Sequence, residues 1–437
     1  MRVALFTVGC KVNQYETEAI AEKLEAFGFE RVDFSNEADV YVINTCTVTK
    51  ESDYSSRQAI YRAKRRSPDA KIVVTGCYAQ LEKEFLKTLP GVSMVIKQEE
   101  KEMLPSKVAE MFGLKGKDTK TETDKIEDQF FGYGVKGLAK HTRALVKIQD
   151  GCEKNCTYCV VPFARGKERC RDVHQILSEV NALVENGYKE MVLTGVHIGR
   201  YNNNGVSLAG LSEKILKETK VERIRYSSID PKEFSDQLIN FVSQSDKICR
   251  HFHIPLQSGD DLILTKMRRD YSTEEYRKLI DKITQAIPDV MIGADIIVGF
   301  SGETDQQFEN TCSFIISSPI SYLHVFSYSD RKGTEASSMP DKIPADVIHK
   351  RSENLHDLGK EKWRGYLDRF VGRELDVLIE NRRDRYTGKL TGLSDNYIRV
   401  LLEGDDDLKN TIVPINIIKR EGNKLIGQIQ KTCRGDS

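Results

Sequence analysis

One stretch decides the fold: residues 143–166 read RALVKIQDGCEKNCTYCVVPFARG. An aliphatic, β-branched run, typical of a buried strand, leads directly into Cys152, Cys156 and Cys159, spaced CxxxCxxC. Thiolates suit iron–sulfur clusters and zinc. A closed zinc site needs four ligands, whereas three thiolates on a cubane cluster leave one iron open. The motif therefore favours a catalytic iron–sulfur cluster, with a zinc site completed by Cys170 or a distant histidine as the alternative.

The strand before this motif is the first of a series. Residues 141–368 repeat a strand followed by a helix about six times, which predicts a partial (β/α)6 barrel. The expected strands are RALVKIQDG, EMVLTGV, RIRYSSID, FHIPLQS, MIGADIIVGF and YLHVFSYS. Barrel chemistry lies on the loops after the C-terminal strand ends, so the cysteine motif is expected at the catalytic rim.

Residues 1–113 also alternate strands and helices, which predicts an N-terminal α/β domain with a parallel sheet. Three apolar runs, RVALFTVG, DVYVINTC and KIVVTGC, end at or beside Cys10, Cys46 and Cys77. Because the carboxyl ends of parallel strands share one edge, these cysteines can converge. The alternative is three buried free cysteines, since buried Cys packs as a small hydrophobe. Their shared position favours a second three-thiolate site.

The remaining regions complete an α/β fold with a small all-β addition. Residues 114–140 are charged and poor in aliphatics, so we expect a linker. Residues 371–433 form short strands separated by turn signals, which predicts a small antiparallel β-barrel of a kind that often binds nucleic acid. The other cysteines show no partner spacing and receive no role: Cys170, Cys249, Cys312 and Cys433.

Composition narrows the classes of protein. Lys plus Arg equal Asp plus Glu at 66 each, so any polyanionic partner must be held by local basic patches. No apolar stretch approaches the roughly 20 residues that cross a bilayer, and the N-terminal run is too short for a signal peptide. We therefore expect a cytoplasmic protein with no membrane partner. In that compartment ten cysteines indicate metal or redox chemistry rather than disulfides.

Along nearly its whole length the chain resembles the methylthiotransferase family of radical-SAM enzymes. The matching segments are VGCKVNQYET, VINTCTVT, VTGCYAQ, GCEKNCTYCVVPFARG, VLTGVHIGRY, SSIDP, HIPLQSGDD, MRRDY, ADIIVGF and FSYSDRKGT. CxxxCxxC is shared by the superfamily, whereas the three N-terminal cysteines and a C-terminal TRAM domain specify this family. GCKVNQYE is closest to the branch acting on N6-threonylcarbamoyladenosine in tRNA. Ser301 departs from the family's usual proline, which loosens a turn but removes no ligand.

The resemblance implies two 4Fe-4S clusters and S-adenosyl-L-methionine (SAM). A cluster on Cys10, Cys46 and Cys77 would bind and methylate the sulfur to be transferred. The other would cleave a second SAM to a radical that takes hydrogen from C2 of the threonylcarbamoyladenosine beside the anticodon. Implied partners are the tRNA anticodon stem-loop, an electron donor such as a flavodoxin or ferredoxin, and a sulfur source. Alternative targets are isopentenyladenosine in tRNA or a ribosomal-protein aspartate; the alternative class is a non-catalytic, metal-containing RNA-binding protein.

Motif matches also suggest binding residues, and no catalytic residue beyond the cluster ligands is assigned. The SAM pocket is expected to include Tyr158, Gly195, Ser228, Gln257, Asp295 and Gly299. Their alternative roles are ordinary packing, turns and caps. Basic clusters expected to contact RNA are Arg382, Arg383, Arg385 and Lys389 in the TRAM region, and Arg62, Lys64, Arg65 and Arg66 in the N-terminal domain. Either cluster alone can equally be a solvated charged face.

Overall fold

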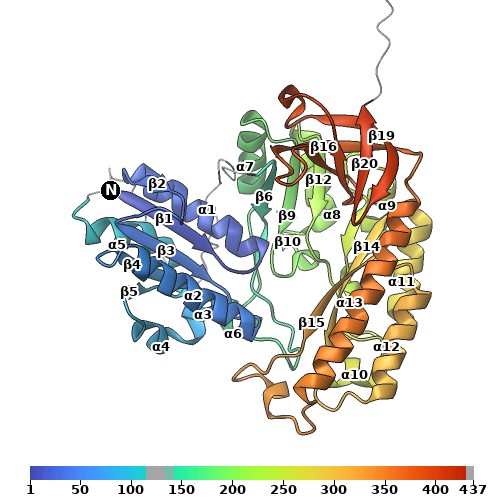
Figure 1. Cartoon of the computed structure of the whole chain (residues 1–437), viewed down its shortest axis with the longest axis horizontal. Coiled ribbons are helices and arrows are strands. Elements are labelled where there is room, and N and C mark those ends of the chain that lie inside the picture. Colours follow the sequence, from blue (N-terminus) through green and yellow to red (C-terminus); the bar gives the residue numbers. More distant parts are fainter. Residues whose placement is uncertain (115–134, 136, 138–140, 430–437) are drawn as a thin grey trace, which may run out of the picture.

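The computed structural model describes residues 1–114, 135, 137 and 141–429. The expected linker, 114–140, and Cys433 lie almost wholly outside these residues. Figure 1 shows an N-terminal α/β unit, in blue, beside a larger unit of strands and helices, with a small all-β unit, in red, at one end of the latter. Within the described part of the chain, no helix combines the length and the apolar content needed to cross a bilayer.

The N-terminal unit is built on a five-stranded sheet in the order β2-β1-β3-β4-β5, with every pair parallel. Its strands are β1 (Arg2–Thr7), β2 (Glu30–Val32), β3 (Val40–Thr45), β4 (Lys71–Gly76) and β5 (Val92–Val95). Its helices are α1 (Lys11–Ala26), α2 (Lys50–Arg66), α3 (Cys77–Leu81), α4 (Lys83–Lys87), η1 (Gln98–Met103) and α5 (Leu104–Met111). The parallel sheet is confirmed. The short edge strands β2 and β5 were not predicted, because neither forms a long apolar run.

The second unit contains the six predicted parallel strands, in two sheets ordered β12-β9-β6 and β13-β14-β15. A bridge between Ile224 and Ile248 links the two sheets, so the predicted partial barrel is confirmed. The strands are β6 (Arg143–Lys147), β9 (Glu190–Thr194), β12 (Arg223–Tyr226), β13 (His251–His253), β14 (Met291–Val298) and β15 (Tyr322–Ser327). The helices are α6 (Val161–Arg165), α7 (Val173–Glu185), α8 (Leu208–Glu218), α9 (Asp236–Ser243), α10 (Asp261–Lys266), α11 (Thr273–Ala286), α12 (Asp305–Ser317) and α13 (Ala345–Asp368).

Side chains on opposite faces of β6 and β9 pack into the cores of two different units. Ala144 and Val146 pack with the main core of the barrel unit. Leu145 and Val192, which point the other way, instead belong to the apolar cluster of the N-terminal domain. Since successive side chains of a strand face opposite sides, α1 and its neighbours cover the inner side of these strands.

The C-terminal unit is a closed barrel ordered β16-β17-β18-β20-β19, consistent with the expected TRAM-like domain. Its strands are β16 (Glu374–Arg383), β17 (Leu390–Ser394), β18 (Arg399–Leu402), β19 (Ile412–Glu421) and β20 (Lys424–Ile429). It is fixed to the start of β9 and β12 by the buried Arg225, which pairs with Glu190 at 2.7 Å. Arg225 also donates to the Ser394 and Asp395 carbonyls at 3.0 and 2.9 Å. The C-terminal barrel therefore lies at the end of the larger unit opposite the predicted catalytic rim.

Candidate active site

The CxxxCxxC loop follows β6 and the two-residue strand β7 (Gln149–Asp150). Its three thiols lie close together: burial, with the neighbouring Cys156 and Cys152, raises the pKa of Cys159 to about 12. The loop is held in place from outside, because Thr157 N–H donates to the Met267 carbonyl at 3.2 Å. Partly buried thiols that repel one another when ionised suit a bound cation, so the donor set fits a metal cluster.

Arg269 supports this loop and was not predicted. Its Nη1 donates to Cys156 Sγ at 3.2 Å and its Nε donates to the Tyr271 hydroxyl at 3.1 Å. Its Nη2 forms an ion pair with the Asp230 carboxylate, and the Arg269 side chain is 5% exposed. A buried guanidinium favours a thiolate as its partner. Arg269 belongs to the MRRDY segment, but nothing in that pattern showed which cysteine it approaches.

His197 lies beside Cys152 and bears on the zinc alternative. Its Nδ1 is 3.9 Å from Cys152 Sγ and 3.0 Å from Glu168, while its Nε2 is 2.5 Å from Glu233. Burial alone would lower the pKa of His197, but hydrogen bonds with Cys152 and the two carboxylates raise it to about 10. The ligand atoms of Cys152, Glu168 and His197 all lie within 4.8 Å of one another, so the geometry also allows His197 to complete a metal site, as the zinc alternative requires.

The structure also brings the N-terminal cysteines together. Cys46 Sγ would lie 2.8 Å from a Cβ added to Gly9, the residue before Cys10. Burial raises the pKa of Cys46 to about 11, and the nearby Cys77 and then Cys10 add to the shift. The convergence follows from β1, β3 and β4 ending at one edge of the parallel sheet. Cluster binding by this trio stays a prediction.

Gly9 offers a direct test, because φ is +102° and an added Cβ would lie 2.6 Å from Cys46 Cβ. We expect Gly9→Ala to displace Cys46 and reduce the iron bound per chain from about eight to about four, the content of one cubane. Gly210→Ala is the matched control: its added Cβ meets nothing nearer than 3.5 Å. Iron and sulfide analysis measures the result, and full iron in Gly9→Ala would contradict it.

A buried ionic network lies between the two trios. Glu16 on α1 is 2.6 Å from Lys101, 2.8 Å from Lys147 and 3.0 Å from Arg165. Asp150 pairs with Lys147 at 2.7 Å and with Arg165 at 2.9 Å. Every one of these side chains is at most 7% exposed. The network thus ties α1 and η1 of the N-terminal domain to β6 and α6 of the barrel unit.

The network also acts on the N-terminal trio. Burial raises the pKa of Cys77, whereas the nearby Arg165 and Lys101 lower it. Among the described residues, Glu16 and Asp150 face Lys101, Lys147 and Arg165. Of these three cations, Arg165 and Lys101 act on the Cys77 thiol. Sequence analysis missed it entirely, because Glu16 lies 131 residues from Lys147 and 149 from Arg165.

The predicted SAM residues fall near the carboxyl ends of the strands. Asp295 on β14 accepts hydrogen bonds from His253 at 2.8 Å and lies 3.3 Å from His324. Gln257 adopts φ +69° and its N–H donates to the Asp295 carbonyl at 2.8 Å. Tyr158 packs against the cluster that contains Phe300. Contact between SAM and these three residues stays a prediction.

The other three predicted SAM residues have different surroundings. Gly299 adopts φ +74°, and an added Cβ would lie 2.3 Å from Ile348 on α13, which is a packing reason for glycine. At Gly195 the added atom would lie 2.7 Å from the Gln149 carbonyl, so close backbone contact explains that glycine. Ser228 is exposed. None of these contacts shows a ligand, and their SAM roles also stay predictions.

The two predicted RNA-binding clusters are largely engaged within their own domains. Arg383 pairs with Asp406 at 2.8 Å and Lys389 with Glu403 at 3.1 Å, while Arg385 lies over the Tyr386 ring. On α2, Arg62 stacks on Phe6, Lys64 donates to the Pro68 carbonyl, Arg66 donates to the Phe34 carbonyl, and Arg65 is exposed. Arg382 differs from these, because it lines a cavity.

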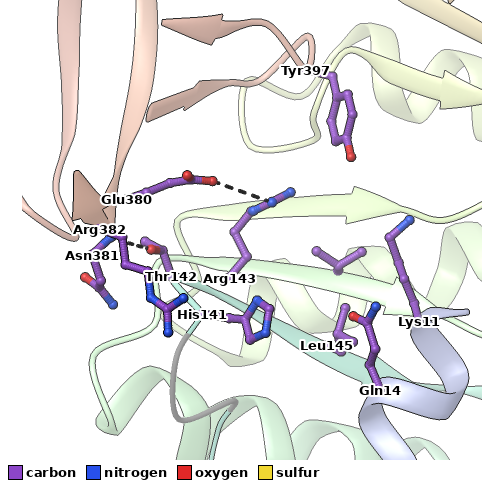
Figure 2. Close-up of a pocket in the computed structure, with 11 residues that line it drawn as sticks. Lys11, Gln14, His141, Thr142, Arg143, Leu145, Glu380, Asn381, Arg382 and Tyr397 are labelled. Carbon is purple, nitrogen blue, oxygen red and sulfur yellow. Dashed lines mark hydrogen bonds and ion pairs between the residues drawn. The ribbon is translucent and has the colours of Figure 1, made fainter. Parts of the chain in front are cut away.

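That cavity, about 240 Å³ in volume, lies where the three units meet. Figure 2 shows Lys11 and Gln14 extending from α1, Arg143 rising from β6 and Tyr397 reaching in from the C-terminal barrel. Its lining consists of Lys11, Gln14, His141, Thr142, Arg143, Leu145, Val192, Glu380, Asn381, Arg382 and Tyr397. Lys11 directly follows Cys10 in the chain, so one side of the cavity is formed by the residue next to the N-terminal trio. No sequence pattern predicted this convergence.

Comparison with known proteins gives two family matches: Uncharacterized protein family UPF0004 over residues 2–97 and the Radical SAM superfamily over residues 146–315. Threonylcarbamoyladenosine tRNA methylthiotransferase MtaB of Bacillus subtilis is 39% identical, with 95% of this chain and 94% of that protein covered. The MtaB of Aquifex aeolicus is also 39% identical, covering 92% and 97%. A tRNA-2-methylthio-N(6)-dimethylallyladenosine synthase of Cereibacter sphaeroides is 34% identical, covering 97% of each chain.

Among solved structures, the radical S-adenosylmethionine methyltransferase TsrM from Kitasatospora setae superposes with a TM-score of 0.53. It is 15% identical, and the match covers 75% of this chain and 74% of that one. At this identity the likeness concerns the fold alone. It supports the arrangement of the parallel strands around the CxxxCxxC loop.

Proposed function

The chain belongs to the methylthiotransferase family of radical-SAM enzymes, and on that premise we propose that it methylthiolates C2 of N6-threonylcarbamoyladenosine beside the anticodon of tRNA. The observation that carries the proposal is the pairing of two cysteine trios, tied by one buried network, in a chain 39% identical to MtaB over 95% of its length. The dimethylallyladenosine synthase, at 34%, marks the alternative target.

Enzymes of this family use SAM and 4Fe-4S clusters, and the donor sets on the chain fit them. We propose that Cys152, Cys156 and Cys159 hold one cluster and that a second trio, Cys10, Cys46 and Cys77, holds the other. When bound by the Cys152, Cys156 and Cys159 thiolates, such a cluster would supply the electron for SAM cleavage. The fit rests on three free thiols brought together at each site, of which Cys46 and Cys77 are buried and those of the CxxxCxxC loop are partly buried.

The protein's own residues would position and shield the reacting groups. Arg269 holds Cys156 by a buried hydrogen bond, and the Glu16 network fixes one trio relative to the other. SAM is proposed to contact Tyr158, Gln257 and Asp295 at the strand ends. Excluding water there protects reactive species from side reactions.

The remaining assignments belong to the same proposal. The division is a methylthiotransferase domain at 1–113, a linker at 114–140, a radical-SAM barrel at 141–368 and an RNA-binding TRAM domain at 371–433. The target base lies in a single-stranded loop, so it can be turned into the site without melting a helix. The proposed partners are tRNA, an electron donor such as a flavodoxin or ferredoxin, and a sulfur source. Since the reaction would need all of them, we propose that the enzyme acts in the cytoplasm.

The proposal is tested by mass spectrometry of tRNA nucleosides from cells with and without the gene. We expect the methylthio form of threonylcarbamoyladenosine to disappear without the gene and to return with the wild-type chain. The chain carrying Cys46→Ala, expected to cleave SAM but not transfer sulfur, should not restore it. If threonylcarbamoyladenosine never gains the methylthio mass, while isopentenyladenosine does, the chain serves the other branch.

A further inference from the structure

The cavity at the junction of the three units carries a marked excess of positive charge. Lys11, Arg143 and Arg382 line it, and Glu380 is the one carboxylate among its described lining residues. Glu380 is itself 2.9 Å from Arg399, which lies outside the lining, and only 3.8 Å from Arg143. The cations therefore exceed the charge available within the cavity to balance them.

Two of these cations have no partner among the residues that the structure describes. In residues 1–114 and 141–429, no hydrogen bond or ion pair involves the Lys11 ammonium or the Arg382 guanidinium. The neighbouring His141 responds to the same field: burial lowers its pKa, and Arg143 and Arg382 lower it further. Cations left unpaired in a recess favour an anionic ligand.

The position of the cavity connects it to the proposed sulfur-transfer site. Lys11 is the residue after Cys10, and it forms part of the first turn of α1, where the helix dipole also favours anions. Lys11 and Arg143 both act on the buried His251, so their charges reach the inside of the barrel. Tyr397, which stacks on His251 at 4.3 Å, closes the cavity from the C-terminal barrel (Figure 2).

We propose that this cavity binds the carboxylate-bearing N6 substituent of the target nucleoside, with Lys11 and Arg143 as specificity-determining residues. The inference rests on the proposed function and names how the substrate is selected. N6 and C2 lie on either side of N1 on the Watson–Crick edge of adenine, so a base with C2 facing the trios carries its N6 substituent close to them. The volume, about 240 Å³, is roughly eight times that of a liquid water molecule, enough for a threonyl group.

The chemistry separates the two candidate substrates. A threonylcarbamoyl group offers a carboxylate, which arginine can bind through two parallel N–H donors, and a hydroxyl and amide for Gln14 and Asn381. A dimethylallyl group has no acceptor. It would displace water from the unpaired cations without offering them a hydrogen-bond acceptor, and this desolvation is unfavourable for binding. The polar lining therefore selects the charged substituent.

The test compares three synthetic anticodon stem-loops, carrying threonylcarbamoyladenosine, its threonyl methyl ester, or unmodified adenosine. The ester removes the negative charge of the substituent and adds one methyl group. Dissociation constants are measured by anaerobic fluorescence anisotropy for the full chain and for Lys11→Gln and Arg143→Gln. We expect the wild-type chain to prefer the acid over the ester by about tenfold or more, and each variant to lose most of that preference while binding the ester as before.

The control variant is Lys282→Gln, an exposed lysine on α11 that pairs with Asp236; it should keep the preference. Equal weakening of acid and ester by Arg143→Gln would overturn the inference, because it would indicate a backbone phosphate contact. An unchanged preference in both variants would overturn it as well, while leaving the proposed function intact. A wild-type chain that neither prefers the acid nor methylthiolates that stem-loop would overturn both.

Discussion

Replacing Cys156 with alanine is expected to remove the metal bound at the CxxxCxxC loop and to abolish SAM cleavage. Two remaining thiolates do not hold a cubane cluster, and the buried Arg269 would lose a partner now 3.2 Å from its Nη1. Iron should fall from about eight to about four per chain. The yield of 5′-deoxyadenosine from SAM, followed by chromatography under anaerobic conditions, should fall by a factor of about 10³ or more.

Cys312→Ala provides the matched control, because Cys312 lies on α12 outside both trios. It should keep full iron, sulfide and SAM cleavage. Continued SAM cleavage by Cys156→Ala would refute the assignment of the cluster ligands. Zinc without sulfide in the wild-type protein would instead favour the non-catalytic, RNA-binding alternative.

The placement of the two trios could be predicted because it follows from topology. A cysteine after each of three parallel strands must lie at one edge of the sheet, and β1, β3 and β4 are adjacent in the sheet. The loop after β6 is fixed in the same way by the barrel. In both cases one local pattern, an apolar run followed by a cysteine, was enough to place the residue.

The residues that support the trios could not be predicted, because they meet only in space. His197 and Cys152 are 45 positions apart, and Arg269 and Cys156 are 113 apart. Glu16 lies in an ordinary polar stretch of α1, yet its side chain is 1% exposed. Nothing in the local sequence distinguishes such a glutamate from one on a solvated helix face.

The cavity shows that basic residues clustered in the sequence are not always the ones left without an acidic partner in the fold. The NRRDRYTGK run was one of two predicted basic clusters, but its Arg383 is paired with Asp406 in the folded chain. The cavity takes Arg382 from this run and adds Lys11 and Arg143 from the other two units, where no basic cluster was predicted at those residues. A reading based on local clusters finds the first pattern and misses the second.

Glu16→Gln is expected to destabilise the protein by about 3–5 kcal/mol, the usual cost of breaking a buried ion pair from one side. The substitution keeps the shape of the side chain but removes the carboxylate charge that faces Lys101, Lys147 and Arg165. Urea unfolding at neutral pH measures the loss. Glu110→Gln, an exposed position on α5, is the control and should stay within about 0.5 kcal/mol of wild type.

The pH dependence of this effect has a definite sign. Burial alone would raise the pKa of Glu16, but the three cations hold it well below its usual value. A carboxylate with a depressed folded-state pKa contributes stability above its unfolded pKa and loses it as pH falls through the folded value. The difference between wild type and Glu16→Gln should therefore be constant from about pH 6 to pH 8 and should shrink only in strong acid.

A second substitution tests whether the loss of stability in Glu16→Gln comes from unbalanced charge or from lost packing. In Glu16→Gln/Lys101→Met one cation is removed with the carboxylate, so the double variant should recover part of the stability lost by Glu16→Gln alone. A double variant no more stable than Glu16→Gln would contradict the charge argument, as would a Glu16→Gln protein as stable as wild type. Because Glu16 joins α1 to β6 and α6, the variant should also lose more sulfur transfer than SAM cleavage. SAM cleavage needs only the Cys152 loop, whereas transfer requires the N-terminal trio to be held beside it.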